Sequence, residues 1–235
     1  MSYQKNSFSK NIIHFLLHLN TDIKLPRGVE ILNPFAQSEV PKLVNKYYKK
    51  YYLKGEKRIF IFGINPGRLG SGITGISFTD PVNLLNDDGI RHSLPMKSEL
   101  SSQFIHEMFK AYGGLNEFAK DFFLTSISPL GFIANGKNLN YYDTPEMQKK
   151  LKTFIVENMH LQIKCGAYSH IAICLGEGQN LKYFKTLNDE FKWFDRIIPL
   201  PHPRFVMQYK RKEKEKYINR YLETLIFAKN LLKIR

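Results

Sequence analysis

The sequence predicts an α/β fold of three layers, in which helices cover both faces of a central parallel sheet of four strands. Short apolar runs alternate with segments of helical periodicity along the chain, which is typical of this class. The run from Ile59 to Phe62 is apolar without a break, as expected of a strand buried on both faces. No repeat or linker interrupts the 235 residues, so we expect one domain over residues 1–235, with an N-terminal helical extension over residues 1–28.

The remaining elements follow from apolar spacing and from turn residues. Apolar residues at helical spacing predict helices over residues 8–19, 38–52, 98–112, 145–163, 179–190 and 209 to the end. Apolar runs predict three more strands, over residues 121–127, 170–175 and 196–200. Ser98 is expected to cap the third helix, which the pair Gly113-Gly114 would end, and Pro145 stands at the first position of the fourth. Turn formers within residues 80–89 and 135–138 predict loops there.

The charge of the chain indicates a polyanionic partner. Its formal net charge of +14 favours nucleic acid first and an anionic membrane second, with solubility as the alternative interpretation. No signal peptide is present, and no apolar run reaches the length of about 18 residues that a spanning helix needs. We therefore expect a soluble, intracellular protein of the cytoplasm, associated with the nucleoid if it is bacterial, with nucleic acid and not a membrane as its partner.

The residues that bind metals are few and badly placed for a metal site. The two cysteines, Cys165 and Cys174, cannot supply a four-thiolate cluster, and nothing indicates a disulfide framework. His14 and His18 have the i, i+4 spacing of metal ligands on a helix, but no third ligand is evident nearby. We expect neither a metal nor an organic cofactor.

Polar side chains follow the predicted strands where a ligand would bind. In a parallel sheet the loops after the strands share one edge, and these loops carry Asn65, Ser126 with Ser128, Glu177 and His202. The set contains no serine–histidine–acid signature and no pair of carboxylates. It offers an amide, a histidine and hydroxyl groups beside glycine-rich backbone, which suits the positioning of a water and the stabilisation of a developing anion.

A second pattern in the same region suggests a nucleotide-binding protein instead. Residues 70–75 match the dinucleotide fingerprint G-x-G-x-x-G. That motif needs its glycines directly between a strand and a helix, so that the pyrophosphate meets the helix N-terminus. Here the strand ends about six residues earlier and residues 78–81 continue as loop, which favours an accidental match.

The C-terminal segment is basic and begins directly after His202. Residues 204–235 contain ten Lys or Arg and three Glu, a surplus of seven that is half of the total. Apolar and aromatic side chains followed by cations suggest a wedge that enters a duplex beside phosphate contacts, and the alternative is an exposed helix start with ordinary charge. The expected DNA-binding residues are Arg204, Phe205, Gln208, Lys210, Arg211 and Lys212.

These motifs resemble the uracil-DNA glycosylase superfamily, and most closely its single-strand-selective monofunctional (SMUG-like) branch. The first motif of that branch, Gly-Met-Asn-Pro-Gly followed by Gly, Thr-Gly and an aromatic residue, resembles residues 63–78 here, which read Gly-Ile-Asn-Pro-Gly and then Gly70, Thr74-Gly75 and Phe78. The second motif begins His-Pro, as do His202 and Pro203. Pro129-Leu130 and residues 136–139 are similar to two segments that lie between the motifs.

The resemblance implies the fold of that superfamily and a monofunctional DNA glycosylase. Such an enzyme flips uracil, or a related deaminated base, out of DNA and hydrolyses its N-glycosidic bond in base excision repair. By the same resemblance, Asn65 would orient the attacking water, His202 would donate a hydrogen bond to the base O2, and Phe78 would stack on the base. The expected base-binding residues are Gly63, Ile64, Gly67, Phe78, Ser126 and Asn138.

Two departures from the family pattern leave the substrate open. Ser126 stands where the family has an asparagine that reads the base, and a serine hydroxyl is too short to grip a uracil edge with two hydrogen bonds. Asn138 is the candidate to compensate for it. The second motif also lacks the Ser-Pro that follows His-Pro in the family, so its wedge has a different shape. Hypoxanthine, xanthine or a mispaired pyrimidine are the alternative substrates, and a DNA-binding protein without catalysis is the alternative class.

Overall fold

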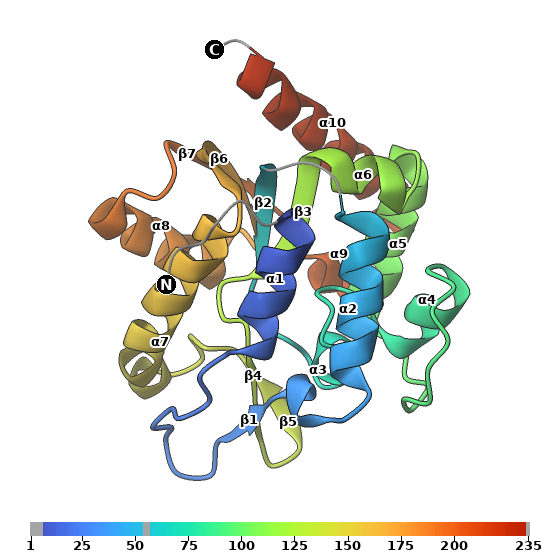
Figure 1. Cartoon of the computed structure of the whole chain (residues 1–235). Helices are drawn as coiled ribbons and strands as arrows, with labels where there is room; N and C mark the ends of the chain where they lie inside the picture. Colours follow the sequence, from blue (N-terminus) through green and yellow to red (C-terminus); the bar gives the residue numbers. More distant parts are fainter. Residues whose placement is uncertain (1–6, 54–56, 234–235) are drawn as a thin grey trace.

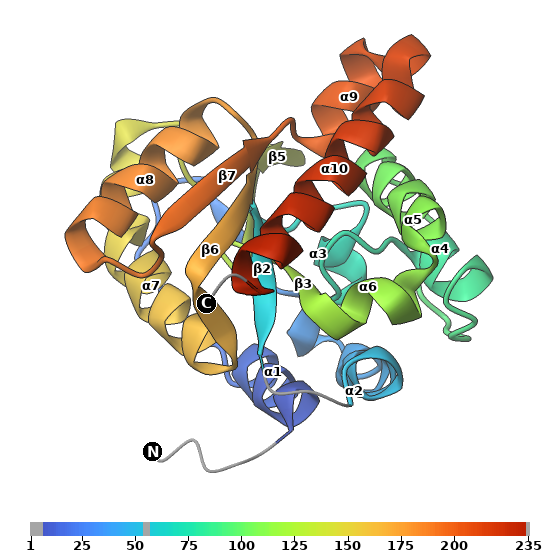
Figure 2. The same ribbon diagram turned by 90° about the horizontal axis from the view of Figure 1, so that it is seen from above.

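The computed structural model describes residues 7–53 and 57–233, and a parallel sheet lies at its centre (Figures 1 and 2). Within these residues the sheet has four strands in the order β3-β2-β6-β7, all parallel. The strands are β3 (Phe122–Ser126), β2 (Arg58–Gly63), β6 (Ala167–Leu175) and β7 (Arg196–Leu200). This confirms the predicted α/β class and the continuous apolar run of β2, in which every residue is buried.

Helices cover both faces of this sheet, as the three-layer prediction requires. Helices α7 and α8 lie on one side of the strands, and α5, α6 and α10 lie on the other (Figure 2). The longer helices are α1 (Phe8–Leu17), α2 (Val40–Tyr51), α5 (Leu100–Tyr112), α7 (Pro145–Lys164), α8 (Gln179–Phe191) and α10 (Lys214–Lys233), and the shorter α6 (Leu115–Asp121), which was not predicted, follows α5. Helix α1 packs against α2 and α7 and contributes Phe8, Ile12 and Phe15 to the core.

Local signals place the ends of several helices where the sequence predicted them. The Thr144 side chain accepts a hydrogen bond of 3.1 Å from the Met147 amide, and Pro145 opens α7. Gly113 ends α5 in the left-handed conformation, with φ of 104°.

The predicted Ser98 cap is wrong. Helix α5 begins two residues later, with Glu99 at the N-cap position and no side-chain cap. The Ser98 hydroxyl instead accepts a hydrogen bond of 2.9 Å from the Gln103 side chain. A serine before an apolar helix fits two neighbouring cap positions equally well, and tertiary contacts at Glu99 decide between them.

A second, antiparallel sheet was missed by the sequence analysis. It consists of β1 (Glu30–Leu32), β4 (Gly131–Ala134) and β5 (Lys137–Leu139), in the order β1-β4-β5. Residues 135–138, which were expected to form a loop, are the turn and start of the β4–β5 hairpin. Strands of three or four residues are too short to show an alternating pattern.

Short helices replace loops at three further places. These are α3 (Ser71–Thr74), α4 (Pro81–Asn86) and α9 (Pro203–Tyr209), with 3-10 turns η1 (Pro34–Ala36) and η2 (Arg211–Glu213). The expected loop within residues 80–89 therefore contains α4, which the Asp80 side chain caps. The predicted C-terminal helix from 209 is α10, and it begins at Lys214. Helix α3 is a single turn, which does not provide the helix that a dinucleotide fingerprint needs.

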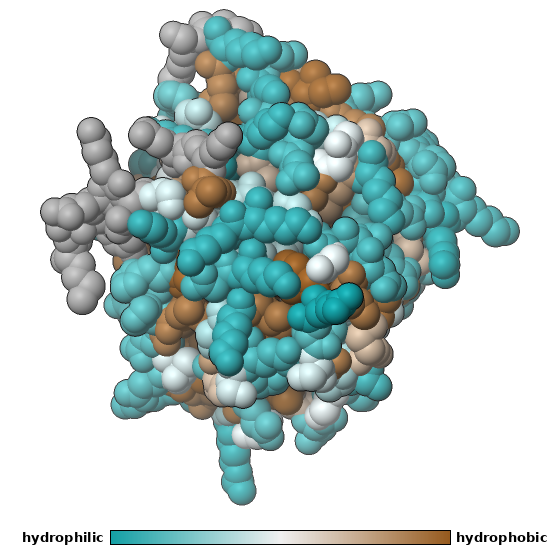
Figure 3. Space-filling view, turned by 45° about the vertical axis from the view of Figure 1, so that its right-hand side comes forward, coloured by the Kyte–Doolittle hydropathy of each residue, from teal (hydrophilic) through white to brown (hydrophobic). Residues whose placement is uncertain are grey.

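The face of the molecule drawn in Figure 3 is mostly hydrophilic. Polar and charged side chains cover most of the face in Figure 3, and apolar side chains lie between them in small groups. No helix among residues 7–53 and 57–233 is both long and apolar enough to cross a membrane. Large apolar side chains that are exposed include Leu53, Met96, Phe205, Tyr209, Ile226 and Phe227.

Candidate active site

The loops that leave the carboxyl ends of the parallel strands meet in one pocket. Gly63 at the end of β2 pairs in register with Ser126 at the end of β3, and β7 leads into His202 on the other side of β2. An inner pocket holds Asn65, Ser126 and His202 together. Its full lining is Ile64, Asn65, Gly67, Ser71, Phe78, Glu99, Ser101, Ser126 and His202.

An outer pocket opens beside the inner one and shares Asn65, Glu99 and His202 with it. Its further lining residues are Pro66, Asn138, Asn140, Arg204, Phe205, Gln208 and Tyr209. The inner pocket is thus the deeper end of a cleft whose rim includes Asn138 of β5 and several residues of α9.

The Asn65 side chain is fixed by the backbone that follows β5. Its Nδ2 donates to the Leu139 carbonyl oxygen over 3.1 Å, and its Oδ1 accepts from the Tyr141 amide over 3.1 Å. One lone pair of Oδ1 remains after these bonds. One backbone partner at each end of the amide holds it in a single orientation, and a group that positions a water needs such a fixed orientation.

The Phe78 ring forms the floor of the inner pocket. A Cβ added at Gly63 would lie only 2.6 Å from Phe78 Cζ, so the ring rests directly on the glycine backbone. The ring centroids of Phe78 and His202 are 6.0 Å apart. Phe78 has φ of 56°, a conformation that is strained for an aromatic residue and that the packing around it must hold. Strain of this kind is typical of residues placed for function.

His202 enters the site as a neutral imidazole. It is the N-cap of α9, and its Nδ1 accepts a hydrogen bond of 3.2 Å from the Arg204 amide. Burial, and to a smaller extent the positive charge of Arg204, lower the pKa of His202 from 6.5 to about 4. Because Nδ1 accepts, the single proton of the neutral ring sits on Nε2, which is therefore a hydrogen-bond donor.

Ser126 lies in the inner pocket, and the other hydroxyl of its segment does not. Ser126 is 7% exposed, and its Oγ lies 3.5 Å from the position of a Cβ at Gly63. Ser128 is buried and donates to the Leu130 carbonyl oxygen over 2.8 Å, so it serves the turn before β4. Glu177 forms an exposed ion pair of 2.6 Å with Arg220. The expectation that Ser128 and Glu177 share the crevice with Asn65 is therefore wrong.

Asn138 lies at the rim of the cleft. It lines the outer pocket and not the inner one. Its Oδ1 accepts a hydrogen bond of 3.0 Å from the Arg68 amide, and its Nδ2 lies 3.5 Å from the position of a Cβ at Gly67. Asn138 thus braces the glycine loop, which places it away from Ser126.

The expected wedge is the exposed side of α9 and not a continuous apolar segment. Phe205 and Tyr209 are 44% and 66% exposed, and their ring centroids lie 5.6 Å apart. Val206 and Met207 are buried in the core between them. The exposed pair stands at the mouth of the outer pocket together with Gln208.

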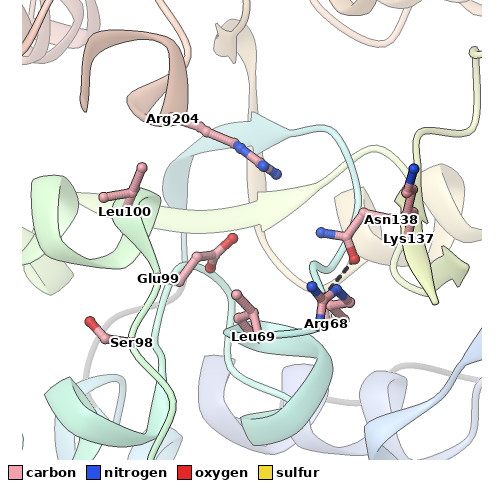
Figure 4. A pocket seen from close by; sticks show the side chains of 8 residues that line it. All are labelled: Arg68, Leu69, Ser98, Glu99, Leu100, Lys137, Asn138 and Arg204. Atoms are coloured by element: carbon pink, nitrogen blue, oxygen red, sulfur yellow. Dashed lines mark hydrogen bonds between the residues drawn. The ribbon is translucent and has the colours of Figure 1, made fainter. Parts of the chain in front are cut away.

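Three residues of the cleft were missed by the sequence analysis. Arg68 and Lys137 line a further pocket that borders the outer one, and Glu99 lines it from the other side (Figure 4). Basic residues in loops have no signature in a single sequence, and Glu99 stood one residue beyond the expected helix cap. No group of His, Cys, Asp or Glu side chains in the described part of the chain could hold a metal ion.

Comparisons with known proteins give one consistent result. The model of the family described as the uracil DNA glycosylase superfamily matches residues 50–226. A crystal structure of wild-type SMUG2 from Pedobacter heparinus is 40% identical, with a TM-score of 0.92, and the alignment covers 95% of this chain and 99% of that one. A search of curated proteins found no match.

Proposed function

Because this chain belongs to the uracil DNA glycosylase superfamily, it is a DNA glycosylase, a hydrolase of N-glycosyl bonds, and we propose that its inner pocket takes uracil flipped out of DNA. The family match confirms the resemblance drawn from the two motifs. One observation carries the proposal: Asn65 and a neutral His202 share a pocket whose floor is the Phe78 ring.

The arrangement suits hydrolysis with an anionic leaving group. The base would stack on Phe78, with its O2 at His202 Nε2. The bond between C1′ and the base nitrogen breaks with its electron pair on the base, water adds at C1′, and the water proton is released. The N–H of a neutral imidazole stabilises the charge that develops on O2, while Asn65 holds the water without accepting its proton.

A larger or different base remains the second candidate substrate. Ser126 is shorter than the amide that the family has at this position, which leaves room and removes one hydrogen-bonding arm. This observation favours hypoxanthine or xanthine. A panel of oligonucleotides that contain uracil, hypoxanthine, xanthine or a mispaired thymine separates the candidates, and excision confined to uracil would exclude the second.

The basic rim is proposed as the surface that binds the DNA backbone. Arg68, Lys137 and Arg204 line a pocket that borders the outer one, with Glu99, Asn138 and Arg204 common to both (Figure 4). Phe205 and Tyr209 are placed to enter the space that a flipped nucleotide leaves. DNA is the partner of a DNA glycosylase. Because the substrate is DNA, a cytoplasmic location is proposed as well.

Removal of two rim cations should reduce the salt dependence of DNA binding. If Arg68 and Lys137 each contact a phosphate, the double variant Arg68→Ala/Lys137→Ala should reduce the slope of log K against log salt by about 2 on duplex DNA. The control Lys57→Ala/Lys164→Ala removes two exposed cations at the opposite edge of the sheet. Fluorescence anisotropy between 50 and 200 mM salt measures both, and equal slopes for the two variants would contradict this surface.

Gly63→Ala should displace the floor of the pocket. The added Cβ would lie 2.6 Å from Phe78 Cζ and 2.8 Å from Cε2, so the ring must move. Since a shift of about 1 Å can reduce a rate a hundredfold, we expect kcat/KM for uracil excision to fall by about tenfold to a hundredfold. Affinity for an oligonucleotide with an abasic site, which has no base to stack, should be unchanged. Wild-type kcat/KM in this variant would show that the base does not lie on Phe78.

The proposed function is tested by incubating the protein with a labelled oligonucleotide that contains one uracil. A monofunctional glycosylase releases free uracil and leaves an intact strand, which breaks only after alkali. No excision of uracil, hypoxanthine or xanthine by the wild type would overturn the proposal. Salt-sensitive DNA binding without excision would then favour a DNA-binding protein that lacks catalysis.

A further inference from the structure

A carboxyl group that has no hydrogen-bond partner among the described residues lies in the cleft. Glu99 lines both the inner and the outer pocket, together with Asn65 and His202. No hydrogen bond or ion pair joins its carboxyl oxygens to any residue in the ranges 7–53 and 57–233. Figure 4 shows the side chain directed into the cleft, and the Arg204 side chain points into the same space. A partly buried polar group of this kind is satisfied by a ligand or by solvent.

The backbone of Glu99 is held firmly in this place. Its amide donates to Asp80 Oδ2 over 2.7 Å, and the other oxygen of Asp80 accepts from the Asn83 amide over 2.8 Å. The Asp80 amide in turn donates to the Ser102 hydroxyl over 3.0 Å. Asp80 is fully buried, so this network ties the first turn of α5 to the start of α4. The Glu99 side chain is thus presented from a rigid support.

The glycine loop after β2 makes room for the carboxyl group. A Cβ at Gly67 would lie 3.0 Å from Glu99 Oε1, and a Cβ at Gly70 would overlap Glu99 Oε2. The glycines that resemble a dinucleotide fingerprint therefore have a different use here. Because Gly67 and Gly70 have no side chains, the Glu99 oxygens can lie against the loop that follows Asn65, at the wall of the inner pocket.

The surroundings of Glu99 keep much of it protonated at neutral pH. Burial and the negative charge of Asp80 raise the pKa of Glu99 to about 7, against the opposing effect of Arg204. The other charged or titratable groups that face it are Arg68 and Lys137 across the cleft and His202, which is neutral. A protonated carboxyl group presents a donor and an acceptor side by side, as an amide does.

We propose that Glu99 binds the flipped base, with its protonated carboxyl group hydrogen-bonded to the N–H and C=O edge that deamination creates. Uracil, hypoxanthine and xanthine all carry a ring N–H beside a carbonyl. Ser126, which lines the same pocket, is too short to hold both groups, and Glu99 supplies the missing pair. This inference rests on the proposed function. Glu99 would take over the contact with the base that the family makes through the asparagine at the position of Ser126.

The test uses Glu99→Gln and Glu99→Leu with the full chain. Glutamine keeps a neutral donor and acceptor, and leucine keeps the volume only. At pH 6 we expect Glu99→Gln to bind and excise within about threefold of the wild type, and Glu99→Leu to lose about tenfold or more in kcat/KM, mainly through KM, as for the loss of hydrogen bonds to a ligand. Inhibition by free uracil gives the affinity for the base directly.

The pH profile separates base binding from a merely structural role. As pH rises from 5.5 to 8.5, Glu99 ionises and its donor is lost, so uracil affinity of the wild type should fall through about pH 7. Glu99→Gln should show no such fall, and its unfolding midpoint at pH 8 should exceed that of the wild type because no buried charge remains. Affinity for abasic-site DNA should be the same in all three proteins.

Two results would overturn the inference. Wild-type uracil affinity in Glu99→Leu would show that the carboxyl group does not touch the base. A loss of about a hundredfold in kcat in Glu99→Gln, with uracil affinity retained, would make Glu99 a general base for the water instead. Failure of the wild type to excise any base would be a different outcome, because it would overturn the proposed function itself.

Discussion

Replacing His202 by alanine should reduce kcat for uracil excision by about a hundredfold to a thousandfold, which corresponds to about 2.7–4 kcal/mol for one lost donor to a developing anion. The donor is Nε2, because Nδ1 accepts from the Arg204 amide. The interaction strengthens as charge moves onto the base, so kcat should fall more than KM rises. Single-turnover excision with saturating enzyme measures the chemical step. A fall of less than about threefold would contradict the role of His202.

The low pKa of His202 sets the acid limit of activity. With its pKa near 4, His202 is neutral between pH 5 and 8, so kcat should stay level there and change only as pH approaches 4. Because the unfolded chain takes up this proton near pH 6.5, stability should also fall as pH decreases from about 6.5 to 4. His202→Gln removes the titrating group and should abolish that part of the loss. A kcat that titrates near pH 6.5 would show a solvated histidine instead.

Asn65→Ala should also lower kcat by about a hundredfold or more, because the attacking water loses the group that positions it. The substitution removes the bonds to the Leu139 carbonyl and the Tyr141 amide, so a lower unfolding midpoint is expected as well. The control Asn116→Ala changes an exposed residue of α6 and should leave both quantities unchanged. Single-turnover rates below the unfolding transition separate catalysis from stability.

Asn65→Asp is the sharper companion variant. One carboxylate oxygen of the aspartate can still accept from the Tyr141 amide. The other takes the place of Nδ2, which in the wild type lies 3.1 Å from the Leu139 carbonyl oxygen. The clash of two acceptors should reorient or protonate the side chain, so we expect a rate below that of the wild type. Unchanged rates in both Asn65 variants would remove Asn65 from the mechanism.

The buried sheet and the residues that it presents could be predicted from the sequence for a physical reason. Strands covered on both faces are continuous apolar runs, as in β2, and their carboxyl ends share one edge. For that reason the order of strands and loops along the chain was enough to place Asn65, Ser126 and His202 together. The reaction itself came from the resemblance, since an amide and a histidine suit several kinds of hydrolysis.

Features that depend on tertiary contacts could not be predicted in the same way. The β4–β5 hairpin is too short to show a period, yet the backbone after it fixes Asn65. Val206 and Met207 of α9 are buried in the core, although the sequence suggested that they belong to an exposed wedge. Glu99 follows Ser98 in the sequence, and only the contacts of Asp80 and the glycine loop show that it enters the cleft.

The central claim is that Asn65 and neutral His202 act together on a base stacked on Phe78. It is tested most directly by single-turnover excision from one uracil-containing oligonucleotide by the wild type, Asn65→Ala and His202→Ala. The account predicts an abasic site and free uracil from the wild type, with rates about a hundredfold lower in each variant. Excision at the wild-type rate by Asn65→Ala, or no excision by the wild type itself, would contradict it.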